Sequence, residues 1–274
     1  MTRRSLLINS LVFLSVAATS VWTAPPVQAA PETITIATSN SLRDTFRRIL
    51  PVFESQNKDI TIRVIYGTSQ NLLKQIEEGA PIDVFLPSWF EDLEQLEKKG
   101  FIIQGTKTVY AGTSLALITG TELPTLAVSA KDLTAAQIRH IAIGDPKTSS
   151  EGKVAAQFLA HSKLEPKNRP SQFVYAEHSK AVQDLVAKGD ADIGVIYRTD
   201  AVSNKKVRIL DTAPIGSHQP VRYGVAAVWT ARNIPGAQEF ISFLTTPQVQ
   251  SLLQEQGFDR LSQQVDIAQR REGQ

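Results

Sequence analysis

The chain has 274 residues and not one of them is cysteine. It can therefore form neither a disulfide framework nor a thiolate metal site, and it has no cysteine to carry a lipid anchor. It also has little excess charge, since 29 lysines and arginines face 27 aspartates and glutamates. A nearly neutral chain offers no extended basic surface for nucleic acid or anionic lipid. We therefore expect no nucleic-acid partner, and any bound anion must be held by local contacts.

Motifs for catalysis or for binding a metal cation are equally scarce. No G-x-S-x-G elbow of a serine hydrolase occurs, and the four histidines form no H-E-x-x-H pair. His178 precedes Ser179, but adjacency in sequence does not make a base and a nucleophile, so a surface or capping role is simpler. The acids of "DADIG", from Asp190, suit a turn better than a hard-cation site. The sequence predicts no catalytic residue, no cofactor and no direct cation ligand, and leaves an exported hydrolase using Ser41 or Ser69 as the enzyme alternative.

The N-terminus has the pattern of a cleaved export signal. Arg3 and Arg4 precede an apolar run, and "VQA" at Val27–Ala29 provides a small-x-small cleavage site. The apolar run, residues 6–18, is shorter than the ~20 residues that span a bilayer, which argues against a membrane anchor. Without the two arginines, 27 basic residues remain against 27 acidic ones. We expect residues 1–29 to be a signal peptide and the mature protein to be periplasmic, with Sec and twin-arginine export both open.

Strand-like and helical patterns alternate along the rest of the chain. After a strand-like run at Thr33–Ala37, the apolar residues Leu42, Phe46, Ile49 and Phe53 recur at the spacing of one helix face. Pro51 lies inside this predicted helix and should kink or split it. Similar pairs of strand and helix follow almost to the C-terminus. The pattern predicts an α/β fold with mainly parallel sheets.

Serine residues lie at several of the junctions between a predicted strand and the following helix. The junction serines are Ser41, Ser69, Ser149 or Ser150, and Ser179. In an open parallel sheet such junctions gather at the carboxyl ends of the strands, where ligands bind. Each helix start offers unpaired backbone N–H groups and a partial positive charge, to which serine adds a hydroxyl. Any one serine could simply cap its own helix, but together they predict an anion site that needs no lysine or arginine.

Two stretches carry a specific family resemblance, "QIEEGAPIDVF" from Gln75 and "ADIGVIYRTDAV" from Ala191. With "ITIATSNSL", "AIGDP" followed by "GKVAAQFL", and "SHQPVRYGVAAV", the chain resembles the periplasmic molybdate-binding proteins, the substrate-binding components of molybdate ABC importers. The resemblance implies a two-lobed periplasmic binding protein fold of type II, hinged on crossover strands near Tyr110–Ser114 and Val221–Ala226. It implies that lobe one comprises residues 30–111 and 224–274, and that lobe two comprises residues 112–223.

The same resemblance implies the ligand and the residues that bind it. Hydroxyl donors would be Ser41, Ser69 and Tyr197, and backbone N–H donors would be Glu151 and Ser179. The ligand would be molybdate or tungstate, so molybdenum or tungsten would be met only as an oxyanion through these residues. The protein would be a monomeric carrier, not an enzyme, and would deliver its ligand to an ABC permease in the inner membrane.

The sequence departs from the family pattern in two places. The family has a small apolar residue in a proline-alanine-glycine turn where this chain has residues 149–152. If only the N–H of Glu151 binds, its side chain can point to solvent. If the carboxylate points inward, it repels a dianion, and Ser150 becomes the alternative donor. This departure leaves sulfate, phosphate or a small carboxylate as the alternative ligand. The second departure is Pro87 and Trp89, and the sequence does not indicate how these residues affect ligand binding.

Overall fold

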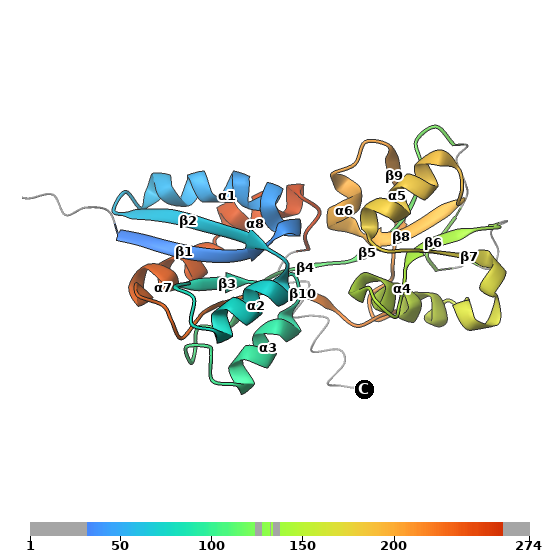
Figure 1. The fold of residues 1–274 in the computed structure, drawn as a ribbon. Coiled ribbons are helices and arrows are strands. Elements are labelled where there is room, and N and C mark those ends of the chain that lie inside the picture. The colour runs from blue at the N-terminus through green and yellow to red at the C-terminus, as the bar shows by residue number, and fades with distance from the viewer. Residues whose placement is uncertain (1–31, 124–127, 132, 134–137, 260–274) are drawn as a thin grey trace, which may run out of the picture. The chain divides into compact units, whose positions relative to one another are not determined.

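The computed structural model describes residues 32–123, 128–131, 133 and 138–259, and the helices and strands given below belong to these residues (Figure 1). The predicted signal peptide lies outside the described residues. Within the described part of the chain, no helix is both long enough and apolar enough to cross a membrane.

The first sheet has the strand order β2-β1-β3-β10-β4. Its strands are β1 (Glu32–Ser39), β2 (Ile60–Gly67), β3 (Val84–Leu86), β4 (Thr108–Thr113) and β10 (Val221–Ala227). The first three are parallel, whereas β10 is antiparallel to both of its neighbours. The helices of this lobe are α1 (Arg43–Gln56), preceded by the 3-10 turn η1 (Asn40–Leu42), α2 (Ser69–Glu77), α3 (Phe90–Lys98), α7 (Ile234–Phe243) and α8 (Pro247–Glu255).

These helices cover both faces of the first sheet, because the side chains of a strand alternate between its faces. Ile34 and Ile36 of β1 pack in one buried cluster with residues of α1, α7 and α8. Ala37 belongs instead to the cluster formed with α2 and α3. The first lobe is therefore a three-layer α/β/α unit, with helices visible on both sides of β1 (Figure 1).

The second sheet repeats this plan with the order β7-β6-β8-β5-β9. Its strands are β5 (Leu115–Gly120), β6 (Ile141–Gly144), β7 (Phe173–Ala176), β8 (Ile193–Tyr197) and β9 (Val207–Thr212). Here β6, β7 and β8 are parallel, and β5 is antiparallel to β8 and β9. The helices are α4 (Ser150–His161), α5 (Ser179–Lys188) and α6 (Arg198–Val202), with 3-10 turns η2 (Pro166–Asn168) and η3 (Pro170–Gln172). Buried clusters lie on both faces, one with α4 and one with α5.

The chain passes between the two sheets twice. It leaves the first sheet at Ser114, between β4 and β5, and returns between β9 and β10. The predicted crossover segments fall on β4 and β10. The residue bounds given for the two lobes in the sequence analysis, and the hinge motion between the lobes, stay predictions. The expectation of mainly parallel sheets is wrong for β4, β5, β9 and β10. β4 and β5 lie in different sheets and are joined directly through Ser114, and each is antiparallel to the strands it pairs with.

Pro51 does not split the helix, since α1 runs unbroken from residue 43 to residue 56, so that half of the prediction is wrong and the kink stays a prediction. The side chains of Phe46, Ile49 and Phe53, on one face of this helix, are almost completely buried. Burial of that apolar face stabilises the helix by more than the roughly 3 kcal/mol that an interior proline costs, since each such side chain contributes about 1.5–3 kcal/mol.

Candidate functional site

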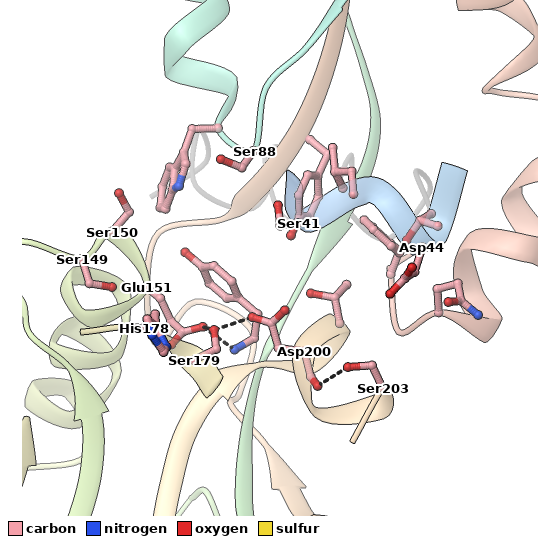
Figure 2. A pocket seen from close by; sticks show the side chains of 18 of the residues that line it. Ser41, Asp44, Ser88, Ser149, Ser150, Glu151, His178, Ser179, Asp200 and Ser203 are labelled. Carbon is pink, nitrogen blue, oxygen red and sulfur yellow. Dashed lines mark hydrogen bonds between the residues drawn. The ribbon is translucent and has the colours of Figure 1, made fainter. Parts of the chain in front are cut away.

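A pocket of about 320 Å³ lies where two parallel strands of the first sheet and three parallel strands of the second sheet end (Figure 2). Ser41 follows β1, Ser88 follows β3, Glu151 follows β6, Ser179 follows β7, and Tyr197 ends β8. The remaining lining residues are mostly polar, and they are Leu42, Asp44, Thr45, Trp89, Ser149, Ser150, Glu177, His178, Thr199, Asp200, Ser203, Tyr223, Gln256 and Phe258. The described lining contains neither lysine nor arginine, so an anion would depend on hydroxyl and backbone N–H donors.

Four of the five predicted ligand residues line this pocket, namely Ser41, Glu151, Ser179 and Tyr197. Ser69 does not. It is buried, and its Oγ accepts a hydrogen bond from the backbone N–H of Ser88 at 3.0 Å and lies 3.0 Å from Ser88 Oγ. Sequence reasoning missed Ser88, although its place directly after β3 is the same signal that singled out Ser41. This placement does not test which ligand the residues hold, so the ligand set stays a prediction.

The N-terminal caps of three helices are Thr68 for α2, Ser149 for α4 and His178 for α5. Ser149 Oγ accepts from Gly152 N at 3.2 Å, and His178 Nδ1 accepts from Ala181 N at 3.1 Å. The predicted capping role of His178 is therefore confirmed. Ser179 is instead the first helical residue of α5, and Thr68 takes the capping place expected for Ser69 on α2. The backbone N–H groups of Ser150, Glu151 and Ser179 belong to residues that line the pocket, and as first-turn groups they have no acceptor within their own helices.

Two glycines bring the start of α4 against the end of β6. A Cβ on Gly152 would lie 2.2 Å from the carbonyl oxygen of Gly144, and a Cβ on Gly144 would lie 3.1 Å from Gly152 N. No larger residue fits at position 152 unless the backbone moves. This close approach carries the neighbouring Glu151 into the pocket, because Glu151 is the second residue of the helix.

The Glu151 side chain points inward, so the possibility that it faces solvent is wrong. The residue is only 6% exposed. Its Oε2 accepts hydrogen bonds from Ser179 Oγ at 2.7 Å and from the backbone N–H of Tyr197 at 3.2 Å, whereas its buried Oε1 has no partner among the described residues. The carboxyl group thus occupies two donors that an oxyanion would otherwise use.

Asp200 of α6 approaches the same serine from the other side. Ser179 Oγ lies 2.5 Å from Asp200 Oδ2, so Ser179 stands between two carboxyl groups (Figure 2). Burial, followed by the charge of Asp200, raises the pKa of Glu151 to about 8. Burial also raises the pKa of Asp200. Desolvation and a like charge both disfavour a second ionised carboxylate, so at neutral pH the two groups carry less than two negative charges.

The Tyr197 hydroxyl is buried at the pocket and has no hydrogen-bond partner among the described residues. Its ring contacts Trp89, with the ring centroids 6.4 Å apart and the planes tilted by 55°. An unpaired buried hydroxyl costs about 1–3 kcal/mol, which a bound acceptor would recover. Trp89, one of the unexplained departures from the family pattern, thus packs beside this donor.

The described residues contain no group of three or more histidines, aspartates and glutamates arranged to hold a metal ion. The acids of "DADIG" belong to loop structure as expected, because Asp192 Oδ2 accepts the backbone N–H groups of Arg139 and His140, both at 2.8 Å.

Comparison with known proteins places the chain among transport proteins. Residues 34–259 match the family described as bacterial extracellular solute-binding protein. The chain is 29% identical to YvgL of Bacillus subtilis, assigned as an ABC transporter substrate-binding lipoprotein, over 82% of this chain and 86% of that protein. It is also 29% identical to the molybdate-binding protein ModA of Escherichia coli, over 82% of this chain and 88% of ModA. The predicted resemblance to the molybdate-binding proteins is confirmed.

Solved structures confirm the two-lobed fold. A substrate-binding domain from Clostridium difficile, attributed to a molybdenum ABC transporter, is 26% identical and superposes with a TM-score of 0.78, over 84% of this chain and 99% of that domain. The sulfate-binding protein SubI of Mycobacterium tuberculosis has the same fold at 20% identity and a TM-score of 0.64, over 84% of this chain and 87% of SubI. The fold is therefore shared by proteins whose names give different ligands.

Proposed function

Because the chain belongs to the bacterial extracellular solute-binding protein family, we propose that it captures molybdate or tungstate in this pocket and delivers it to an ABC importer. The carrying observation is that hydroxyls and helix starts at the ends of five strands, from the parallel parts of two sheets, converge on one pocket whose described lining has no lysine or arginine. Molybdate and tungstate are dianions that only accept hydrogen bonds, so such donors match them. The relatives named as molybdate-binding proteins support this choice of oxyanion.

The donors present are sufficient for tight binding. Tyr197 Oη is unpartnered, Ser41, Ser88 and Ser150 line the pocket, and the starts of α4 and α5 offer backbone N–H groups. A hydrogen bond to a charged group contributes roughly 1.5–3 kcal/mol, and a helix N-terminus about 0.3–1 kcal/mol. Five to seven such contacts reach the ~12 kcal/mol of nanomolar affinity once part of their sum offsets desolvation and ordering.

The proposed transport role has three further parts. The protein acts as a monomer in the periplasm, it uses no cofactor, and its partner is the inner-membrane permease of an ABC importer. The pocket offers no arrangement for turnover, since His178 Nδ1 accepts a backbone N–H and Ser179 Oγ donates to carboxyl oxygens. A binding role therefore explains the site better than hydrolysis.

A second ligand class is favoured by one observation, the inward carboxyl group of Glu151. Ionised carboxylates accept hydrogen bonds, so they repel a bare dianion and suit a solute that carries a hydrogen, such as monohydrogen phosphate. Phosphate is therefore the second candidate. Sulfate offers no hydrogen, as molybdate does not, so this contact gives sulfate no advantage over molybdate.

A thermal-shift series with molybdate, tungstate, sulfate and phosphate tests the proposal. Ligand at 1,000 times its dissociation constant stabilises the folded protein by about 4 kcal/mol, which is several degrees for a protein of this size. We expect the largest shift with molybdate or tungstate. A clear shift with phosphate or sulfate, and none with molybdate or tungstate, would contradict the molybdate proposal.

A further inference from the structure

Ser179 cannot satisfy both carboxyl groups that contact it. Its Oγ lies 2.7 Å from Glu151 Oε2 and 2.5 Å from Asp200 Oδ2, and both contacts are short enough to be hydrogen bonds. A serine hydroxyl has one hydrogen, so it donates to only one of these oxygens at a time. The other contact needs a second hydrogen, and the only groups there that can carry it are the two carboxyls.

Among the described residues, no salt bridge involves Glu151 or Asp200, and the lining of the pocket contains no lysine or arginine. On the side of α5 the nearest charged or titratable residues are Glu177, His178 and Lys180, and Lys180 Nζ lies 3.1 Å from Asp184 Oδ2. On the side of β8 and α6 they are Tyr197 and Arg198, whose guanidinium bonds the carbonyl oxygens of Gly257 and Phe258 and pairs with Asp259. Tyr223 of β10 and Asp44 of α1 complete the surroundings.

We propose that Glu151 and Asp200 share one proton, and that the pocket binds its oxyanion only together with this proton. The inference rests on the proposed function, because it concerns the same site and names its ligand more closely. With the proton present, the pair carries a single negative charge, and both contacts of Ser179 Oγ contain a hydrogen. Without the proton, two carboxylates would face a dianion in a pocket that has no lysine or arginine among its described lining residues.

The titration of the pair sets the pH range of the effect. Burial raises the pKa of Glu151 to about 8. Below that pH the proton is already present, so binding takes up almost none. Above it the free protein has lost the proton, and a bound dianion raises the pKa further, so binding must take one up. Molybdate affinity should then fall by up to about tenfold for each pH unit above 8.

The chemical class of ligand follows from the same balance. A tetrahedral oxyanion that carries its own hydrogen can donate to the pair and replace the missing proton. Molybdate and tungstate carry none in their dianionic forms. The affinity of monohydrogen phosphate relative to that of molybdate should therefore rise as pH increases from 7 to 9, whichever of the two binds more tightly at pH 7.

Calorimetric titration with molybdate, in buffers that differ in ionisation enthalpy, counts the protons taken up per bound anion. For the natural protein we expect nearly none at pH 6 and a value approaching one at pH 9. Glu151→Gln, which stays neutral at every pH, should take up none at either pH and bind about tenfold more tightly than the natural protein at pH 9. The matched control is Asp184→Asn, which removes an exposed carboxylate from α5 outside the pocket and should behave like the natural protein.

Equal proton uptake by the natural protein and Glu151→Gln, with molybdate bound to both, would overturn the inference and leave the proposed function intact. Asp200→Asn provides a second way to remove the pair if Glu151→Gln does not fold. Absence of binding with molybdate, tungstate and phosphate at every pH would overturn the proposed function. It would also overturn the claim that the anion binds together with the shared proton. An infrared carboxylic-acid band at pH 7 that disappears in Glu151→Gln tests the shared proton without any ligand, and its absence would overturn that part.

Discussion

The two sides of the pocket differ in charge, although both are built from residues that follow parallel strands. The side from the first lobe, here the hydroxyl wall, presents Ser41, Thr45 and Ser88. The side from the second lobe, here the acid wall, presents Glu151, Ser179 and Asp200 around one shared hydroxyl. The same topology thus positions mainly hydroxyls on one side, where Asp44 is exposed and pairs with Arg47, and a buried pair of acids on the other. Strand topology determines where a ligand can sit, whereas one or two side chains determine which protonation state of the ligand is accepted.

The acid wall depends on the close approach of α4 to β6, so the largest effect is expected from Gly152→Ala. Its Cβ would lie 2.2 Å from Gly144 O, which cannot be relieved by rotating a side chain. We expect the free energy of unfolding to fall by about 3 kcal/mol or more. Urea denaturation measures this, with exposed Lys153→Ala in the same helix turn as the control. A change below 1 kcal/mol would show that the helix start can move and that the acid wall is adjustable.

Tyr197→Phe tests the unpaired hydroxyl of the second lobe. It should weaken molybdate binding by roughly 10- to 100-fold, the loss of one hydrogen bond to a charged ligand, without lowering stability. Tyr110→Phe is the matched control, because the Tyr110 hydroxyl is also buried with no hydrogen-bond partner among the described residues, but lies in the core of the first lobe. Equal affinity in both variants would remove Tyr197 from the site.

Glu151→Gln tests the protonation of the acid wall through the stability of the ligand-free protein. Because burial raises the pKa of Glu151 to about 8 in the folded protein, the folded state binds more protons than the unfolded state between about pH 5 and pH 8. The natural protein should therefore lose stability as pH rises through this window, by at most about 1.4 kcal/mol per pH unit. The free energy of unfolding of the variant should fall by less between pH 6 and pH 7, as measured by denaturation at the two pH values. Parallel curves for the two proteins would show that the carboxyl is not held neutral.

The smallest effect is expected on the hydroxyl wall. Ser88→Ala should weaken molybdate binding by about 1 kcal/mol, since its hydroxyl exchanges the contact with Ser69 for one with the ligand. Ser69→Ala should weaken binding less, because Ser69 lies behind Ser88 and outside the pocket lining. The reverse order in a calorimetric comparison would favour the assignment that the family resemblance implied.

The fold could be predicted largely from local patterns, because alternating strands and helices and the ordered motifs specify a two-lobed α/β protein. The unbroken helix at Pro51 could not be predicted, since a buried helix face outweighs one proline. The mixed sheets could not be predicted either, because the antiparallel partners of β4, β5 and β10 come from distant parts of the chain. Ser41 and Ser179 could be predicted as pocket residues from the sequence, because each follows a predicted strand. Ser88 was overlooked between two unusual neighbours, and the inward turn of Glu151 depends on a contact between Gly144 and Gly152 that no sequence period reveals.

A crystal structure of the protein with tungstate, located by its anomalous scattering, is the most direct test of the central claim. We predict one tungsten peak in the pocket, with oxyanion oxygens within hydrogen-bond distance of Tyr197 Oη and of the backbone N–H groups that begin α4. A tungsten peak elsewhere with this pocket filled by another solute, or no peak at saturating tungstate, would contradict the account.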